Sequence, residues 1–155
     1  MWARSWLALA GLALVIATAT ALAFLPPSQD QPTIQAELPS NTLALRFGRS
    51  TYNVWQARTL AQKEQGLSGV PAMTKNQGML FDFADGGQKC FWMKDMRFAL
   101  DIVWLDNTKH VVAIEHRLTP ATYPAVFCHN GQYVLELNAG QTVASSLTPT
   151  TTARF

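Results

Sequence analysis

Alternating apolar and polar positions predict that the folded part of this chain consists mainly of short β-strands. In Thr42–Phe47, Leu43, Leu45 and Phe47 fall on one face and Arg46 on the other, a period typical of a half-buried strand. Other runs rich in β-branched and aromatic residues, separated by turn residues, predict strands at 51–56, 79–83, 90–94, 101–105, 111–116, 125–129 and 132–137. The tail, 150–155, is expected to add a last edge strand.

Two local signals mark turns and a helix. Thr59 followed by Gln62 is a capping-box pattern, and Gly66 is well placed to end the short helix that it begins. Asn130-Gly131 is the strongest hairpin signal in the chain, and a two-residue turn there would place Cys128 opposite Tyr133. Together these elements predict a mainly β (α+β) fold. The expected architecture is a compact, curled or barrel-like, mostly antiparallel sheet with one short helix.

The first 25 residues follow a different pattern. Trp6–Leu25 contains no charged side chain, and Arg4 precedes it. The run is long enough to cross a bilayer as a helix. It is interpreted either as a cleavable signal peptide, with Ala21-Leu22-Ala23 as the cleavage site near Ala23, or as an anchor that holds the chain to the cell membrane. The anchor is favoured because Phe24-Leu25 extends the apolar run past the cleavage site. Both interpretations place the domain outside the cytoplasm.

Composition divides the remainder of the chain into two parts. Residues 26–40 are rich in Pro, Gln, Ser and Thr and poor in apolar side chains, which predicts a flexible spacer. Residues 41–155 have the length of a single domain. The net charge of +2 and the absence of a Lys/Arg cluster in the sequence argue against a nucleic-acid partner.

The cysteine and histidine positions limit the chemistry. A Cys90–Cys128 disulfide is the leading interpretation, since such a pair persists outside the cytoplasm; two buried thiols or one reactive cysteine are the alternatives. His110 and His116 lie at the two ends of one predicted strand, roughly 20 Å apart, too far to share a metal ion. The chain has no nucleophile elbow, P-loop or dinucleotide fingerprint. No metal and no cofactor are therefore expected.

Five short motifs in order carry a family resemblance. They are Glu64-Gln65-Gly66-Leu67, Gly78-Met79-Leu80-Phe81, Phe91-Trp92-Met93-Lys94, Leu100-Asp101-Ile102-Val103 and Leu135-Glu136-Leu137-Asn138-Ala139-Gly140. Over about residues 42–145 the chain resembles domain of unknown function family 192, small and often exported β-rich proteins of bacteria and archaea. The resemblance implies a small β-rich fold with a helix, and no established activity. The family often has Asn after Trp-Met-Lys, where this chain has Asp95.

Strand alternation selects the residues that would carry chemistry. Trp92 and Lys94 share one face of their predicted strand, and Glu136 and Asn138 share one face of theirs. We expect an ionisable group beside bulky apolar neighbours to have a shifted pKa, as functional groups often do. The candidate binding residues are Lys94, Glu136, Asp101, Trp92, Asn138 and Glu64. The alternative is structural: an ion pair or a capping carboxylate that fixes strand register.

Three functions fit this set of residues. The leading hypothesis is a non-enzymatic binding or interaction module at the cell envelope, with an unknown small ligand or envelope component as its partner. The rival is an envelope hydrolase or transferase that uses Glu136 or Asp101 as acid/base, with Lys94 as an electrostatic clamp. A stability module without a ligand is the third.

Overall fold

A computed structural model describes residues 42–155. The predictions made for the apolar segment 6–25 and for the spacer 26–40 lie outside the described residues. Within residues 42–155, no helix is long and apolar enough to span a bilayer.

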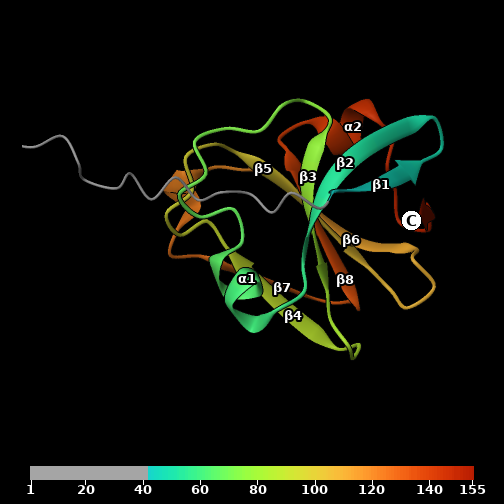
Figure 1. The fold of residues 1–155 in the computed structure, drawn as a ribbon, viewed down its shortest axis with the longest axis horizontal. Helices are drawn as coiled ribbons and strands as arrows, with labels where there is room; N and C mark the ends of the chain where they lie inside the picture. Colours follow the sequence, from blue (N-terminus) through green and yellow to red (C-terminus); the bar gives the residue numbers. More distant parts are fainter. Residues whose placement is uncertain (1–41) are drawn as a thin grey trace, which may run out of the picture. The chain divides into compact units, whose positions relative to one another are not determined.

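The described residues form one large sheet, a two-stranded ribbon and a few short helices (Figure 1). The strands are β1 (Thr42–Phe47), β2 (Ser50–Ala57), β3 (Gln77–Asp82), β4 (Gln88–Trp92), β5 (Leu100–Leu105), β6 (Val111–Leu118), β7 (Val126–Asn130), β8 (Tyr133–Asn138) and β9 (Ala153–Arg154). The helices are α1 (Leu60–Gln65), the 3₁₀ turn η1 (Pro120–Thr122) and α2 (Gln141–Ala144). The large sheet has the order β6-β5-β8-β3-β2-β1-β9, and β4 pairs with β7 in the ribbon.

The prediction of a mainly β, mostly antiparallel fold is confirmed. Among the described strands every pair is antiparallel except β2 with β3, which is parallel because α1 and a loop carry the chain back to the end of the sheet where β2 begins. The large sheet curls into a half-barrel. At one end the tail connects its two edges: Thr150 N–H donates to Val111 O at 2.9 Å and Ala153 N–H to Lys109 O at 2.9 Å, while β9 pairs with β1. The predicted edge strand in the tail is therefore present as β9.

Both faces of the central strands β3, β5 and β8 are buried, and the described residues form two apolar clusters. On β8, Leu135 and Leu137 pack into one cluster, with Leu45, Leu80 and other residues of the concave face. Val134 packs into the other cluster, on the opposite face. That second face is covered by the β4–β7 ribbon and by the segment around α1. The sequence correctly predicted which side chains of β8 share a face, but it predicted that only the face with Leu135 and Leu137 belongs to the core.

The predicted helix begins and ends as expected. The Thr59 side chain accepts a hydrogen bond from Gln62 N–H, and the Gln62 side chain accepts one from Thr59 N–H, which completes the capping box. Gly66 has φ +51°, a conformation that favours glycine, and it ends the helix. The helix buries no side chain of its own. Its position therefore depends on its cap and on the buried residues that follow it, such as Leu67.

The predicted Asn130-Gly131 hairpin is wrong. β7 pairs with β4, so Cys128 lies opposite Cys90, and Tyr133 pairs with strands of the large sheet. At this point the chain passes from the ribbon into the sheet: Gly131 N–H donates to Gly87 O at 3.0 Å, and the next residue bonds Leu105 O. A Cβ at Gly131 would lie 3.0 Å from that Leu105 oxygen. The glycine is thus needed for close packing between strands rather than for a tight turn.

Two further features differ from the sequence prediction. The first difference is in the number of helices: the sequence predicted one short helix, and the structure also has α2 and the 3₁₀ turn η1. β4 ends at Trp92 and not at Lys94, since Asp95 takes a left-handed conformation with φ +56° that turns the chain away. Asp and Asn tolerate this conformation better than most residues do.

Candidate functional site

A cavity of about 300 Å³ lies between α1 and β4. We call it the α1–β4 groove. It is lined by residues 63–68, Phe81, Phe83, residues 88–92, Met96 and Glu136. In Figure 1, α1 lies beside the β4–β7 ribbon, at the lower end of the molecule. One wall is therefore the C-terminal end of a helix and the opposite wall is an entire strand.

Glu136 is the buried ionisable group of this groove. It lies on β8 with Met79 of β3 and Ile102 of β5 as its neighbours in register, and it is only 4% exposed. Within the described residues its Oε2 atom has no hydrogen-bond partner. Loss of hydration through burial raises the pKa of its carboxyl to about 8. At neutral pH Glu136 is thus mostly an uncharged acid, able to donate and to accept a hydrogen bond.

The walls around Glu136 are aromatic and closely packed. The Phe81 and Phe91 rings meet edge to face at 4.9 Å, and Phe91 meets Trp104 at 5.9 Å. The Trp104 indole N–H donates to Lys89 O at 2.9 Å, which fixes β4 against the large sheet. Trp92, which also lines the groove, is 48% exposed. The groove therefore combines a firm inner wall with an exposed indole near its mouth.

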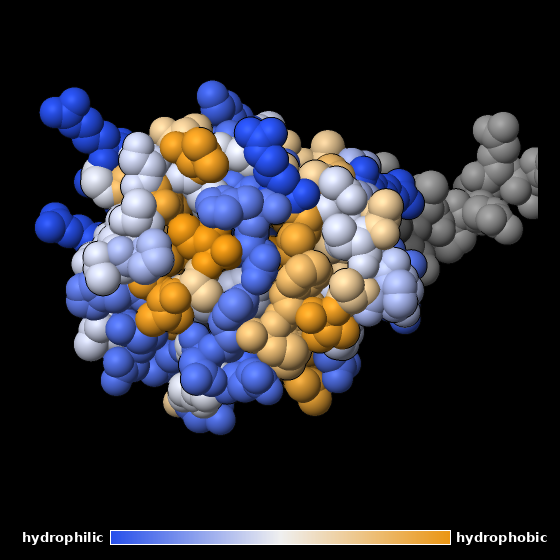
Figure 2. Space-filling view, turned by 180° about the vertical axis from the view of Figure 1, so that it is seen from behind, coloured by the Kyte–Doolittle hydropathy of each residue, from blue (hydrophilic) through white to orange (hydrophobic). Residues whose placement is uncertain are grey.

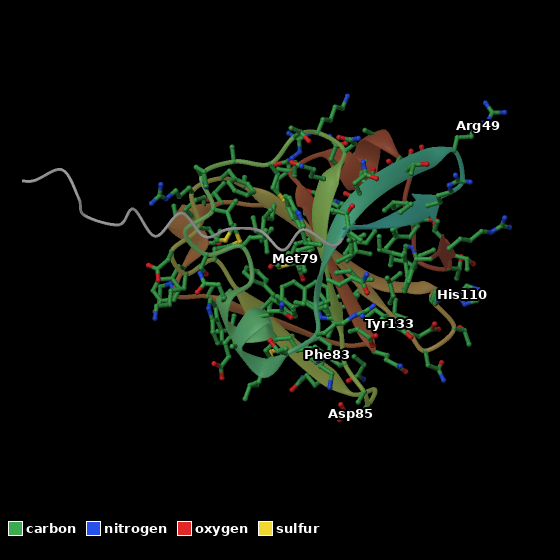
Figure 3. The ribbon with its side chains drawn as sticks, viewed as in Figure 1. Arg49, Met79, Phe83, Asp85, His110 and Tyr133 are labelled. Atoms are coloured by element: carbon green, nitrogen blue, oxygen red, sulfur yellow. A yellow bond between two sulfur atoms is a disulfide. The ribbon has the colours of Figure 1, made fainter. Side chains whose placement is uncertain are left out.

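Two lysines on the rim each contact the same aromatic ring. The Nζ atoms of Lys63 and Lys89 lie 4.8 and 4.9 Å from the centre of the Phe83 ring, an arrangement typical of cation–π contacts. Figure 3 shows Phe83 close to α1, with Asp85 farther out toward the tip of the loop before β4. Asp85 approaches Lys89 at 3.5 Å but its side chain is 83% exposed, so this ion pair contributes little. Glu64 also lines the rim and is exposed.

Asp101 does not belong to this groove, contrary to the sequence prediction. In the β5–β8 register it lies opposite Leu137 rather than Glu136, and successive residues of a strand point to opposite faces of the sheet. Its carboxylate accepts hydrogen bonds from Thr142 N–H, the Thr142 hydroxyl and Arg117 N–H, at 2.7–3.0 Å. Burial acts to raise the pKa of Asp101, but these hydrogen bonds outweigh burial and lower it. Asp101 therefore holds the start of α2 in place.

Lys94 and Asn138 are also outside the groove. Lys94 follows the end of β4 and is exposed, and its backbone carbonyl accepts a hydrogen bond from the Ser68 hydroxyl at 3.0 Å. The Asn138 amide donates to the carbonyls of Met73 and Thr74 at 3.2 and 2.9 Å and so fixes the loop before β3. Of the six predicted binding residues, the structure brings together Glu136, Trp92 and Glu64.

Sequence reasoning missed the two rim lysines and Phe83. Lys63 lies on a helix and Lys89 on a strand 26 positions later, and what they share is the contact that each makes with the Phe83 ring. The alternation of β4 places Lys89 and Phe91 on one face, which was a usable signal. Nothing in the sequence indicates that α1 packs beside this strand.

The predicted disulfide is present. Cys90 and Cys128 are bonded (S–S 2.09 Å) across β4 and β7, with a sequence separation of 38. Cys90 lines the groove. The bond therefore ties one wall of the groove to its neighbouring strand.

Within residues 42–155 no three His, Cys, Asp or Glu side chains come together as metal ligands would. His129 contacts Glu115 at 2.8 Å, and His116 contacts the Thr142 hydroxyl at 2.9 Å, at separate places. The expectation that the domain uses neither a metal nor a cofactor stays a prediction.

Comparisons with known proteins agree on the family and the fold. The model of a family described as Uncharacterized ACR, domain of unknown function family 192, matches residues 43–155. A protein of Sinorhizobium meliloti 1021, described as a suggested transcription regulator, is 28% identical with a TM-score of 0.70, over 74% of this chain and 93% of that one. A protein of unknown function from Novosphingobium aromaticivorans is 22% identical with a TM-score of 0.69, over 74% and 85%. Among curated proteins, none matches significantly.

Proposed function

The chain belongs to domain of unknown function family 192, and we propose that its folded domain is a non-enzymatic binding module whose site is the α1–β4 groove. The observation that supports this most directly is Glu136. Glu136 has a buried carboxyl oxygen with no partner among residues 42–155, which costs folding free energy on the order of 1–3 kcal/mol, and the residue lines a cavity that opens to the surface. A ligand that hydrogen-bonds Glu136 would recover that free energy.

The residues that the rival enzyme hypothesis places in one cleft do not lie together. It used Glu136 or Asp101 as acid/base, in one cleft with Lys94 as an electrostatic clamp. Asp101 lies on the opposite face of the sheet, and Lys94 is exposed beyond the end of β4. A single buried carboxyl in an aromatic groove is better suited to recognising a ligand than to the two-carboxylate chemistry of glycoside hydrolysis.

We also propose that the module works at the cell envelope, outside the cytoplasm. The basis is the apolar run Trp6–Leu25 in the sequence, together with a disulfide that persists in an oxidising compartment. A role in binding nucleic acid, as the description of the Sinorhizobium protein would suggest, fits poorly with a net charge of +2 and no basic cluster in the sequence.

The test uses two soluble probes of different chemistry, a tetramer of N-acetylglucosamine and a pool of blocked heptapeptides. The full chain, kept in solution with mild detergent because of Trp6–Leu25, is titrated with each while backbone amide resonances are followed. We expect at least one probe to shift residues 63–68 and 88–92. Glu136→Leu should weaken binding by about tenfold or more, since it removes the buried hydrogen-bonding group while keeping its bulk.

Glu136→Gln is the matched control, because an amide still donates and accepts hydrogen bonds in the same place. It should bind within a few-fold of the unchanged chain. The proposal is overturned if neither probe shifts the groove at millimolar concentration, or if Glu136→Leu binds as tightly as Glu136→Gln.

A further inference from the structure

One edge of β4 has backbone groups that pair with no other strand of residues 42–155. Gly131 N–H donates to Gly87 O at 3.0 Å, so these two residues form a hydrogen-bonded pair at the end of the ribbon. Hydrogen-bonded pairs recur every second residue in an antiparallel ladder, which directs the N–H and C=O groups of Lys89 and Phe91 toward β7. Those of Gln88, Cys90 and Trp92 then point away from β7. Within residues 42–155 no strand pairs with β4 on that side.

The disulfide independently supports this assignment. The Cα atoms of Cys90 and Cys128 are 4.1 Å apart. Opposite residues in antiparallel strands are about 4.5 Å apart in non-hydrogen-bonded pairs and about 5.5 Å apart in hydrogen-bonded ones. Cys90 is therefore in a non-hydrogen-bonded pair, as the position of the Gly87–Gly131 pair requires.

This free edge faces the α1–β4 groove. All five residues of β4 line the groove, whereas no residue of β7 does. The groove is thus bounded by a strand edge on one side and by α1 on the other. Peptides that bind as an added strand use such a place: the edge supplies main-chain hydrogen bonds, and a neighbouring pocket selects a side chain.

The size of the cavity fits one side chain better than a whole ligand. At about 300 Å³ it is at the lower limit of pockets that enclose small molecules, which range from about 300 to 1,000 Å³. A peptide needs only one pocket of this kind, since its backbone makes the remaining contacts. Glu136 at the inner end would then hydrogen-bond the inserted side chain.

The charge at the rim favours an acidic peptide. The titratable side chains that line the groove are Lys63, Lys89, Glu64 and Glu136, and Glu136 is mostly uncharged at neutral pH. Two ammonium groups therefore face one exposed carboxylate. The nearby Asp85 is 83% exposed, so a ligand carboxylate can replace it beside Lys89 at little cost.

We propose that the α1–β4 groove binds an extended acidic peptide, which adds as a third strand to the free edge of β4, places one side chain against Glu136 and pairs a carboxylate with Lys63 and Lys89. This inference rests on the binding function proposed above and names the class of ligand.

A display library of heptapeptides, each with one Glu at a varied position, is selected on the full chain. The selected peptides are then remade in two forms, one with alternate backbone N–H groups methylated and one with Glu replaced by Gln. We expect methylation on the face toward β4 to weaken binding by tenfold or more, and methylation on the other face to have little effect. The Gln form should bind several-fold more weakly, with a smaller dependence on salt.

Amide hydrogen exchange locates the bound peptide. The amides of Cys90 and Trp92 should exchange quickly in the free protein and become protected when peptide binds. Gln88→Pro removes an edge N–H without touching the ladder to β7, and Gln88→Ala loses the same side chain but keeps that N–H. We expect the Pro variant to bind about tenfold more weakly than the Ala variant.

Either of two results overturns the inference. One is a library that yields no binding peptide, or only peptides whose Gln forms bind as tightly as their Glu forms; the other is a selected peptide that binds while Cys90 and Trp92 exchange as before. If the saccharide tetramer shifts the groove in the earlier test and peptides do not, the peptide inference fails while the binding function stands. If neither probe binds, both fail. The test with methylated peptides uses the unchanged protein, so its result does not depend on whether a protein variant folds.

Discussion

Two buried carboxyl groups on neighbouring strands behave in opposite ways because their hydrogen-bond partners differ. Asp101 accepts three hydrogen bonds from Thr142 and Arg117, and its pKa is lowered despite burial. Glu136 has an oxygen without a partner among the described residues, and burial raises its pKa to about 8. The sequence presented the two as equivalent candidates. Only the strand register, with Asp101 opposite Leu137, shows that the Asp101 carboxylate has a structural role while the Glu136 carboxyl faces the groove.

Glu136 makes the stability of the protein fall as pH rises. Between its ordinary pKa of 4.5 and about 8, the folded protein holds a proton that the unfolded chain has released. The free energy of unfolding therefore decreases through this window, by on the order of 5 kcal/mol in total. Glu136→Gln has no such proton, so it should match the unchanged chain near pH 4.5 and be increasingly more stable above it. Urea unfolding at about pH 5, 7 and 9 measures the difference.

Glu64→Gln is the control for this prediction. Glu64 lines the same groove but is exposed, so its replacement removes a carboxyl from the groove without removing a buried one. Stability curves for Glu136→Gln that run parallel to those of the unchanged chain at every pH would contradict the raised pKa.

At the scale of elements, predictions held where the partners are close in sequence. The capping box of α1 joins Thr59 and Gln62, three positions apart, and it formed as expected. The Asn130-Gly131 hairpin failed because the partner of β7 is β4, with the paired cysteines 38 positions apart. Lys94 was assigned to the face of Trp92 by extending a strand that ends two residues earlier. Alternation predicts side-chain direction only while the strand continues.

Gly78 is a point of close contact between β3 and β8. A Cβ there would lie 2.6 Å from the backbone oxygen of Glu136 and 2.8 Å from Leu137 Cδ2. Gly78→Ala must therefore push the two strands apart, and we expect a loss of about 1–3 kcal/mol in the free energy of unfolding. Because Glu136 is on the displaced strand, probe binding to the α1–β4 groove should also weaken.

Gly86→Ala is the comparison for this change. No atom of the described part of the chain lies within 4 Å of a Cβ built at Gly86, so this variant should unfold within about 0.5 kcal/mol of the unchanged chain. Thermal unfolding of the two variants side by side makes the measurement. Equal stabilities of the two variants would contradict the close contact between β3 and β8 at Gly78.

At the scale of the whole molecule, apolar surface separates into patches on the face opposite to that of Figure 1, with a hydrophilic strip between them (Figure 2). The exposed large apolar residues come from separate elements, among them Leu60, Trp92, Val112 and Val143. Scattered exposed side chains of this kind are usual on soluble surfaces. The α1–β4 groove is distinguished from them by its buried carboxyl and its free strand edge.

The tail closes the half-barrel, and its removal tests how far the two ends of the molecule depend on each other. Deleting Ala153–Phe155 removes the pairing of β9 with β1, the hydrogen bond from Lys109 Nζ to Phe155 O at 2.6 Å, and the Tyr133–Phe155 ring contact. We expect the free energy of unfolding to fall by about 2 kcal/mol or more. Amide exchange should quicken in β1 and at Val111.

The ribbon should respond differently to this deletion. β4 is tied to β7 by the disulfide and to the large sheet by the Trp104–Lys89 hydrogen bond, and neither involves the tail. Exchange in β4 and probe binding in the groove should therefore stay as they were. Arg154→Ala, at an exposed position of β9, controls for sequence change without loss of the strand. If β4 exchanges as fast as β1 after the deletion, the half-barrel and the groove unfold as one unit, and the tail has a part in holding the site together.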